Sequence, residues 1–230
     1  MATGRRRAPT ITCAVRTRNA VTIATPPLPT APVPALLPLA LLEAVRGLDR
    51  PAPDALDEYH DELSAKRLGL NRTVSLEIER LERLGARGRV TTGELAALLR
   101  LVARRHDAAL VFSEAGRRAA RRAARGLSWG TRASLAILPR PLRSLVGFAV
   151  AARLAARVLG LDLRRDGAAA GAEPLAGVTP PESGSACTFY GSAVAELLRL
   201  LTDFDGAMVH VGCRSRGDAA CHWRSARLHS

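Results

Sequence analysis

Two stretches near the C-terminus decide the fold: Cys187-Thr-Phe-Tyr-Gly and, after an aliphatic segment, Met208-Val-His-Val-Gly-Cys-Arg-Ser-Arg-Gly-Asp-Ala-Ala-Cys-His-Trp223. The H-x-x-C step from His210 to Cys213 predicts two metal ligands at the end of a strand, where a turn brings imidazole and thiolate to one point. The step from Cys213 to Cys221 spans a predicted hairpin, and residues opposed across a hairpin lie about 5 Å apart at Cα.

Cys187 completes the set, because it stands at the start of a predicted helix whose positive dipole end favours a thiolate. Cys187, His210, Cys213 and Cys221 together offer three thiolates and one imidazole, the closed tetrahedral shell of structural zinc. No coordination position is left for a catalytic water. The spacing alone leaves two other interpretations open, namely buried thiols beside an unrelated histidine, or a Cys213–Cys221 disulfide.

The residues around these ligands have simpler predicted roles. Gly217 and Asp218 suit a tight turn, since glycine permits positive φ and aspartate can bind nearby backbone amides. His222 is expected on the strand face opposite to Cys221, and therefore at the surface. Cys13, the fourth cysteine, stands apart from the cluster.

These motifs resemble the C-terminal signature of the 4-vinyl reductase domain family. The shared features are Cys followed by aromatic residues, a polar residue three before the second Cys, and Gly-Asp-x-x-Cys followed by an aromatic. That family usually has Glu where this chain has His210, which is also a good zinc ligand. The segment Glu114–Arg117 is similar to an early helix of the family, so the resemblance covers roughly residues 106–226.

The resemblance implies a helix-rich α+β fold, similar to trafficking-complex (TRAPP-type) subunits, with a small antiparallel sheet and a zinc-pinned C-terminal hairpin. The family includes accessory proteins of bacteriochlorophyll synthesis and sensor domains of phenol- and xylene-responsive activators. In the sensors, a small hydrophobic or aromatic molecule lies between the long helices and the sheet. The corresponding ligand-binding candidates here, each also explicable as a core residue, are Phe112, Trp129, Phe148, Phe189 and Tyr190.

Composition favours a globular, helical protein. Of the 230 residues, 47% are apolar and only 3% aromatic, so the chain can bury a core but offers few stacking platforms. The net charge of +13 comes almost entirely from arginine. An Arg stripe (Arg117, Arg118, Arg121, Arg122 and Arg125) could contact phosphates. It has no interleaved aromatics and no helix-turn-helix signature, so a solvated helix face is the simpler interpretation.

The chain divides into a predicted disordered tail (1–32), an N-terminal helical region (33–105) and the 4-vinyl-reductase-like domain (106–226). Helices are predicted from Leu36 to Val45, from Asp54 towards Lys66, and after Asn71. A Thr91–Glu94 capping box begins the next helix. Ser113 is expected to cap a helix over 114–125, and a long apolar helix should run over about 142–159. One or two short strands are predicted within 161–184, a helix from Ser185, and strands over 207–211 and 219–224.

Three functions compete. The first is a non-catalytic binding or sensing domain for a small hydrophobic or aromatic molecule, acting as a homodimer or through a protein effector. The second is an accessory or reductase-like factor of (bacterio)chlorophyll or tetrapyrrole synthesis. The third is nucleic-acid binding through the Arg stripe. The sequence favours a non-enzymatic role, because it has no dinucleotide fingerprint, P-loop, catalytic triad or open metal site. With no spanning helix or export signal evident, we expect a cytoplasmic protein.

Overall fold

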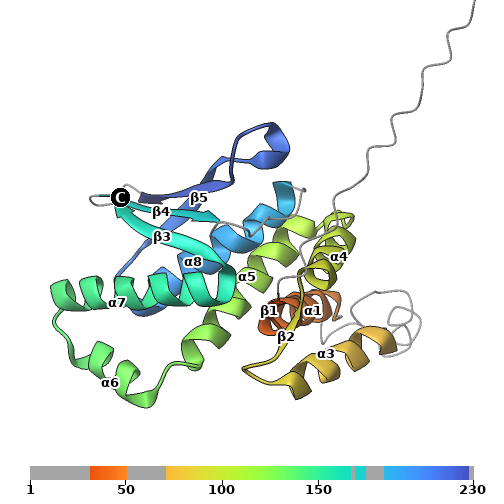
Figure 1. Cartoon of the computed structure of the whole chain (residues 1–230), viewed down its shortest axis with the longest axis horizontal. Coiled ribbons are helices and arrows are strands. Elements are labelled where there is room, and N and C mark those ends of the chain that lie inside the picture. The colour runs from red at the N-terminus through yellow and green to blue at the C-terminus, as the bar shows by residue number, and fades with distance from the viewer. Residues whose placement is uncertain (1–31, 51–70, 167–168, 175–183, 228–230) are drawn as a thin grey trace, which may run out of the picture.

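The computed structural model describes residues 32–50, 71–166, 169–174 and 184–227, which form a helix-rich α+β structure (Figure 1). Its helices are α1 (Leu36–Asp49), α3 (Arg72–Leu84), α4 (Thr92–Ala103), α5 (Ala108–Arg125), α6 (Trp129–Ile137), α7 (Arg140–Leu154) and α8 (Cys187–Leu201). Its strands are β1 (Pro32–Pro34), β2 (Arg89–Thr91), β3 (Leu161–Asp166), β4 (Ala169–Pro174), β5 (Gly206–Gly212) and β6 (His222–Arg227). A π-helical turn (Ala155–Leu159) and two 3₁₀ turns (Gly184–Ala186 and Arg214–Arg216) join some of them.

The main sheet has the order β3-β4-β6-β5, and every neighbouring pair is antiparallel. It lies over α7 and α8, and α5 and α1 follow on the far side of α8 (Figure 1). The helix-rich α+β class with a small antiparallel sheet is therefore confirmed.

The helices α5 and α8 pack at unusually short distance because glycine and alanine line their contact. A Cβ placed on Gly116 of α5 would lie 2.3 Å from the carbonyl oxygen of Phe189 and 2.9 Å from the backbone nitrogen of Ala193. Both atoms belong to the backbone of α8 and cannot rotate away. Gly116 therefore sets the separation of the two helices around which the main core is built.

The N-terminal region belongs to the same body. Helix α1 packs along α5 in the main core, and a smaller core joins α1 to α3 through residues such as Leu39, Ile78 and Leu81. The short pair β1–β2 closes this second core from the side. The first helices therefore pack on the domain that follows them in the chain.

Several predicted helix ends are confirmed by their hydrogen bonds. The Asn71 side chain accepts a bond from the amide of Thr73 at the start of α3, and Gly85 ends that helix with φ +68°. Thr91 caps α4 by accepting from the amide of Glu94. The predicted helix over 54–66 and the predicted tail lie outside the described residues, apart from Pro32 in β1.

Two boundary predictions were wrong, and a third is met within two residues. Ser113 does not cap a helix, because α5 already begins at Ala108 and its buried residues Val111 and Phe112 continue the helical period. The last strand begins at His222 rather than at 219, since a 3₁₀ turn and a bend occupy the residues before it. The apolar helix begins at Arg140, with Pro141 in its first turn, and its last five residues form the π-helical turn.

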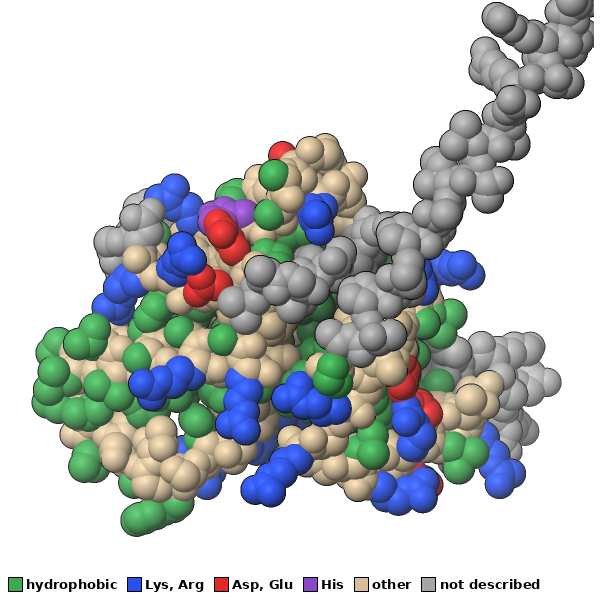
Figure 2. Space-filling model, viewed as in Figure 1, with side chains coloured by type: hydrophobic (Ala, Val, Ile, Leu, Met, Phe, Trp, Pro, Cys, Tyr) green, Lys and Arg blue, Asp and Glu red, His purple; other side chains and the backbone are tan. Residues whose placement is uncertain are grey.

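Helix α6 was missed altogether, and it is the most exposed of the described helices of the main body. Only Leu135 is buried, whereas Trp129 and Ile137 are 79% and 84% exposed. Hydrophobic side chains gather over the α6–α7 arm (Figure 2), where Leu142 and Leu145 are also exposed. Among the described residues no helix combines the length and apolar character needed to span a membrane.

An ion cluster fastens the end of α1 to the start of α5. The guanidinium of Arg105 binds the carboxylates of Asp49, at 2.6 Å, and Asp107, at 2.8 Å. The hydrogen bond from Arg105 lowers the pKa of Asp107, against the opposing effect of partial burial. Asp49 and Asp107 are 58 residues apart in the sequence, so this cluster joins distant parts of the chain.

We predict that Gly116→Ala destabilises the fold, because the added methyl group must push α8 away from α5. The expected loss is about 1–3 kcal/mol, the usual cost of overpacking, measured by chemical or thermal unfolding. Gly93→Ala is the matched control, since a Cβ there meets only the Thr91 hydroxyl at 3.9 Å and gains helix propensity. Equal destabilisation of both variants would contradict the role given to Gly116.

The Asp107 ion pair predicts an acid-sensitive contribution to stability. Because the folded state lowers the pKa of Asp107, the contribution is complete above the ordinary aspartate pKa of about 4. It is lost as the pH falls through the folded pKa, where the carboxylate becomes protonated. The difference in unfolding midpoint between the native protein and Asp107→Asn should therefore be constant near neutral pH and shrink towards pH 3. A difference that grows towards acid would contradict this sign.

Candidate metal centre

The structure brings the four sequence-predicted ligands together from three elements. Cys187 is the first residue of α8, His210 lies on β5, Cys213 follows the end of β5, and Cys221 immediately precedes β6. One ligand atom from each residue lies within 4.8 Å of all the others, and the Sγ atoms of Cys187 and Cys221 are 3.7 Å apart. Zn–S bonds near 2.3 Å in a regular tetrahedron place sulfurs about 3.8 Å apart. The spacing therefore fits a four-coordinate metal ion.

A β-bulge explains how His210 and Cys213 reach the same point. In a regular strand, residues three apart point to opposite faces. Here His210 pairs with Trp223, and Gly212 pairs with His222. Between these two pairs β5 advances by two residues, whereas β6 advances by one. The extra residue, Val211, resets the alternation. Because of this inserted residue, the side chains of His210 and Cys213 reach the same side of the hairpin, where both can serve as ligands of one ion.

Burial of the donors is nearly complete. The three cysteines are 1–2% exposed, and they are free thiols. The Nε2 atom of His210 is buried and has no hydrogen-bond partner among the described residues. A buried imidazole nitrogen without a partner carries a desolvation cost. A metal ion would satisfy it, which is a second, independent reason to read the cluster as a metal site.

The electrostatics of the thiols also fit a cation. Burial and the neighbouring Cys221 raise the pKa of Cys187, since thiolates this close repel each other. Burial and the nearby Arg216 lower the pKa of His210, which favours the neutral imidazole that binds metals. A divalent ion at the centre would replace mutual repulsion of the thiolates by attraction.

Cys213 differs from its neighbours, because its surroundings stabilise the thiolate. Burial alone would raise the pKa of Cys213, but hydrogen bonds from the hydroxyl and amide of Ser215, together with contributions from Cys187 and Arg216, lower it. The Ser215 hydroxyl lies 2.9 Å from Sγ. This hydrogen bond was not foreseen, although a serine two residues after a ligand cysteine is a signal that could have indicated it.

The turn and the tryptophan hold the ligands in place. Asp218 accepts a hydrogen bond from the amide of Cys213 at 2.5 Å, and Gly217 has φ +96°, so the predicted turn roles are confirmed. Trp223 is 1% exposed, stacks on His210 with ring centroids 5.1 Å apart, and donates from Nε1 to the carbonyl of Cys187. Its contact with both ligands joins the hairpin to α8.

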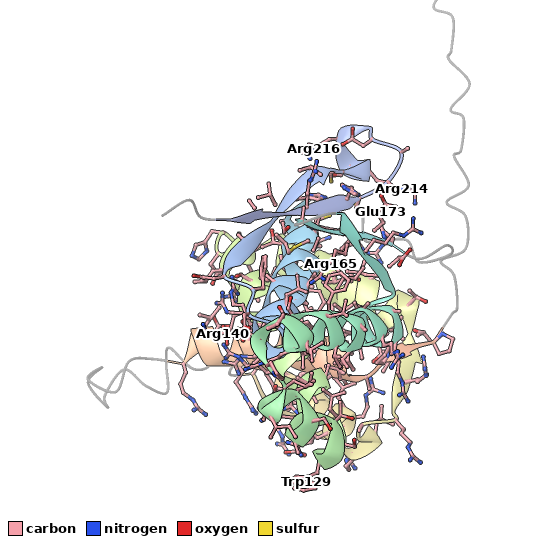
Figure 3. All side chains as sticks on the ribbon, turned by 90° about the vertical axis from the view of Figure 1, so that its left-hand side faces the viewer. Trp129, Arg140, Arg165, Glu173, Arg214 and Arg216 are labelled. Atoms are coloured by element: carbon pink, nitrogen blue, oxygen red, sulfur yellow. The ribbon has the colours of Figure 1, made fainter. Side chains whose placement is uncertain are left out.

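His222 lies outside the cluster, as expected. Its Nδ1 atom is 2.8 Å from a carboxylate oxygen of Glu173 on β4, and its side chain is 37% exposed. In the view of Figure 3, Glu173 lies near the same end of the molecule as Arg214 and Arg216 of the hairpin turn. Cys13 lies outside the described residues.

The five aromatic ligand candidates do not surround one cavity. Phe112, Phe189 and Tyr190 are core residues, each less than 5% exposed, and the last two meet edge to face. Phe148 is half-buried below Arg165, which lies 5.0 Å from its ring centroid. Trp129 projects from the opposite end of the molecule (Figure 3). Their assignment to a ligand stays a prediction.

The Arg stripe is largely neutralised by acidic partners. Arg117 and Arg118 bind Glu114, Arg121 binds Glu196, and Arg122 binds Glu43. The partner Glu196 is itself 7% exposed. These pairs leave less free positive charge for phosphates than the sequence alone indicates, which weakens the nucleic-acid hypothesis.

Comparison of the chain with protein-family models, with curated proteins and with solved structures gave no match.

Tryptophan fluorescence can test the buried environment beside the metal cluster. The chain has two tryptophans, and Trp129→Phe leaves Trp223 as the sole emitter. Because Trp223 is 1% exposed and Trp129 is 79% exposed, the variant should lose most of the acrylamide quenching seen in the native protein. Adding a strong chelator should make Trp223 accessible again. Full quenching of the variant before chelation would contradict the packing described here.

Proposed function

We propose that this chain is a non-catalytic, zinc-stabilised binding module for a small hydrophobic or aromatic molecule. The observation that carries the proposal is the convergence of three thiols and one imidazole within 4.8 Å. Cys187, His210, Cys213 and Cys221 would hold the zinc ion. When bound, zinc supplies a fixed divalent charge that pins the hairpin to α8.

The donor chemistry favours zinc over other metals. Thiolate and imidazole donors at tetrahedral spacing suit Zn²⁺, whereas Ca²⁺ and Mg²⁺ prefer oxygen donors. Four protein donors complete the shell, and this is typical of structural rather than catalytic zinc. A stabilising role also agrees with the burial of all three cysteines.

The family assignment is part of the same proposal. A 4-vinyl-reductase-like, TRAPP-like domain is supported by the signature residues, which form one cluster, and by the antiparallel sheet packed on long helices. In this assignment the hairpin, its bulge and Trp223 form a rigid end for α8. The remainder of α8 then serves as the wall of a binding site.

A cavity large enough for a small molecule lies at the other end of α8. It has a volume of about 810 Å³ and is bordered by α1, α5, α6, α7 and α8. Small-molecule sites commonly measure about 300–1,000 Å³. Buried Leu135 and Leu201, with Leu127, provide an apolar wall. The cavity therefore supports a binding role for this fold better than the dispersed aromatic residues do.

The zinc site predicts a specific pattern of metal loss. Protein purified with zinc should contain one ion per chain by native mass spectrometry, and Cys213→Ser should lose it. A site with free zinc at a hundredfold excess over Kd contributes about 3 kcal/mol, so the unfolding midpoint should fall by roughly 5–10 °C.

The matched control is His222→Gln, because His222 neighbours Cys221 but binds Glu173 instead of the cluster. It should retain zinc and a nearly unchanged midpoint. Retention of zinc by Cys213→Ser, with an unchanged midpoint, would refute the proposed coordination.

A further inference from the structure

The cavity at the C-terminal end of α8 has a wall that is strongly cationic. Six arginines line it, against two glutamates. Those arginines come from three consecutive helices, in the order Arg118, Arg121, Arg122 and Arg125 on α5, Arg132 on α6 and Arg143 on α7. Residues that are distant in sequence thus deliver positive charge to one concave surface.

The two glutamates neutralise only part of this wall, because both bind arginines of α5. Glu43 binds Arg122, and Glu114 binds Arg118 together with Arg117. Arg121 is bound by Glu196, which does not line the cavity. The first three cavity arginines of α5 are therefore held in place by acidic partners.

The other three cavity arginines have no such partner. Among the described residues, Arg125, Arg132 and Arg143 form no ion pair with a carboxylate. The Nε atom of Arg143 is also buried, and it has no hydrogen-bond partner in the part of the chain that the structure describes. A buried guanidinium N–H that is neither hydrated nor bonded is costly. Because Arg143 also lines the cavity, an anionic ligand group there would meet a guanidinium that has no carboxylate partner among the described residues.

The same cavity also has an apolar lining. Leu127 and Leu135 belong to the α5–α6 side, and Leu201 ends α8. Leu135 and Leu201 are 6% and 4% exposed. A ligand that uses the whole cavity must place an apolar body against these leucines and a negative group against the unpaired arginines.

We propose that the cavity binds an anionic amphiphile, a small molecule with an apolar or aromatic body and a carboxylate or other oxyanion gripped by Arg143, Arg132 and Arg125. This rests on the proposed function as a binding module and specifies its ligand class. Arginine suits the role because its planar fork binds oxyanions in bidentate fashion. The apolar wall supplies affinity, and the arginines supply selection for charge.

Two fluorescent probes that differ in one group test the proposal. Anilinonaphthalene sulfonate carries an aromatic body and a negative charge, and N-phenylnaphthylamine has the same aromatic body without the sulfonate. Both would be titrated into the zinc-loaded full chain. Hydrogen bonds to a charged group are worth about 1.5–3 kcal/mol. The sulfonate probe should therefore bind at least about tenfold more tightly than N-phenylnaphthylamine.

Arginine variants test whether the preference for the sulfonate probe arises in the cavity. Arg143→Met keeps the length of the side chain but removes its charge, and should abolish most of the preference for the sulfonate. Arg153→Met is the matched control, because Arg153 lies exposed on the same helix and outside the cavity. It should leave the preference unchanged. If Arg143→Met fails to fold, Arg132→Met on the exposed helix α6 tests the same contact.

The outcomes separate the two proposals. Equal binding of both probes, or a preference that survives both Arg143→Met and Arg132→Met, would overturn the anionic ligand class and leave the binding function intact. Absence of binding by either probe to zinc-loaded protein would overturn both. Sulfonate selectivity lost in the cavity variants and kept in Arg153→Met would support the assignment.

Discussion

The close contact of α8 with its neighbours is the constraint on which the other features depend. Gly116 allows the backbone of α5 to approach α8. Gly191 of α8 leaves room for the indole of Trp223, because a Cβ on Gly191 would lie only 3.0 Å from the indole Cδ1 atom. A third glycine, Gly147, brings α7 against the carbonyl of Leu201. Helix α8 thus meets its neighbours at glycine contacts in its first half and at its last residue. The metal cluster forms at its first residue and the cavity at its last.

The sequence predicted that Cys187, His210, Cys213 and Cys221 come together, and the structure places them within 4.8 Å of one another. The spacing alone left other interpretations open, and the resemblance to a family signature favoured this one. The helix start at Cys187 could be read from the aliphatic pattern that follows it. The bulge at Val211 could not be predicted. An extra strand residue is defined only by its pairing across the hairpin, and neighbouring sequence carries no signal for that pairing. The error in the start of β6 has the same origin.

Errors elsewhere arose where tertiary packing outweighs local signals. Ser113 looks like a helix cap, yet the buried pair Val111 and Phe112 extends α5 past it. The missed helix α6 has a Ser128 cap, but it buries only Leu135 and so shows no clear apolar period. The Arg stripe was visible as a sequence pattern, whereas its ion pairs with Glu43 and Glu196 were not. Those glutamates lie on α1 and α8, 79 and 75 residues from the arginines that they bind, Arg122 and Arg121. A single sequence cannot reveal which distant acid will meet which base.

The arrangement also indicates how the metal and the cavity are related. Helix α8 has 15 residues, so its two ends are about 22 Å apart. At that distance two unit charges interact by less than about 1 kcal/mol at an effective dielectric constant of about 20, so the charge of a bound metal ion would act only weakly on a ligand in the cavity. Any coupling between the two must be mechanical. A bound metal ion would fix the hairpin and the start of α8, and the glycine contacts would carry that fixed position along the helix to Leu201. On this proposal, a bound metal ion would keep the cavity wall formed by α8 in position, and the cavity arginines would select the ligand by its charge.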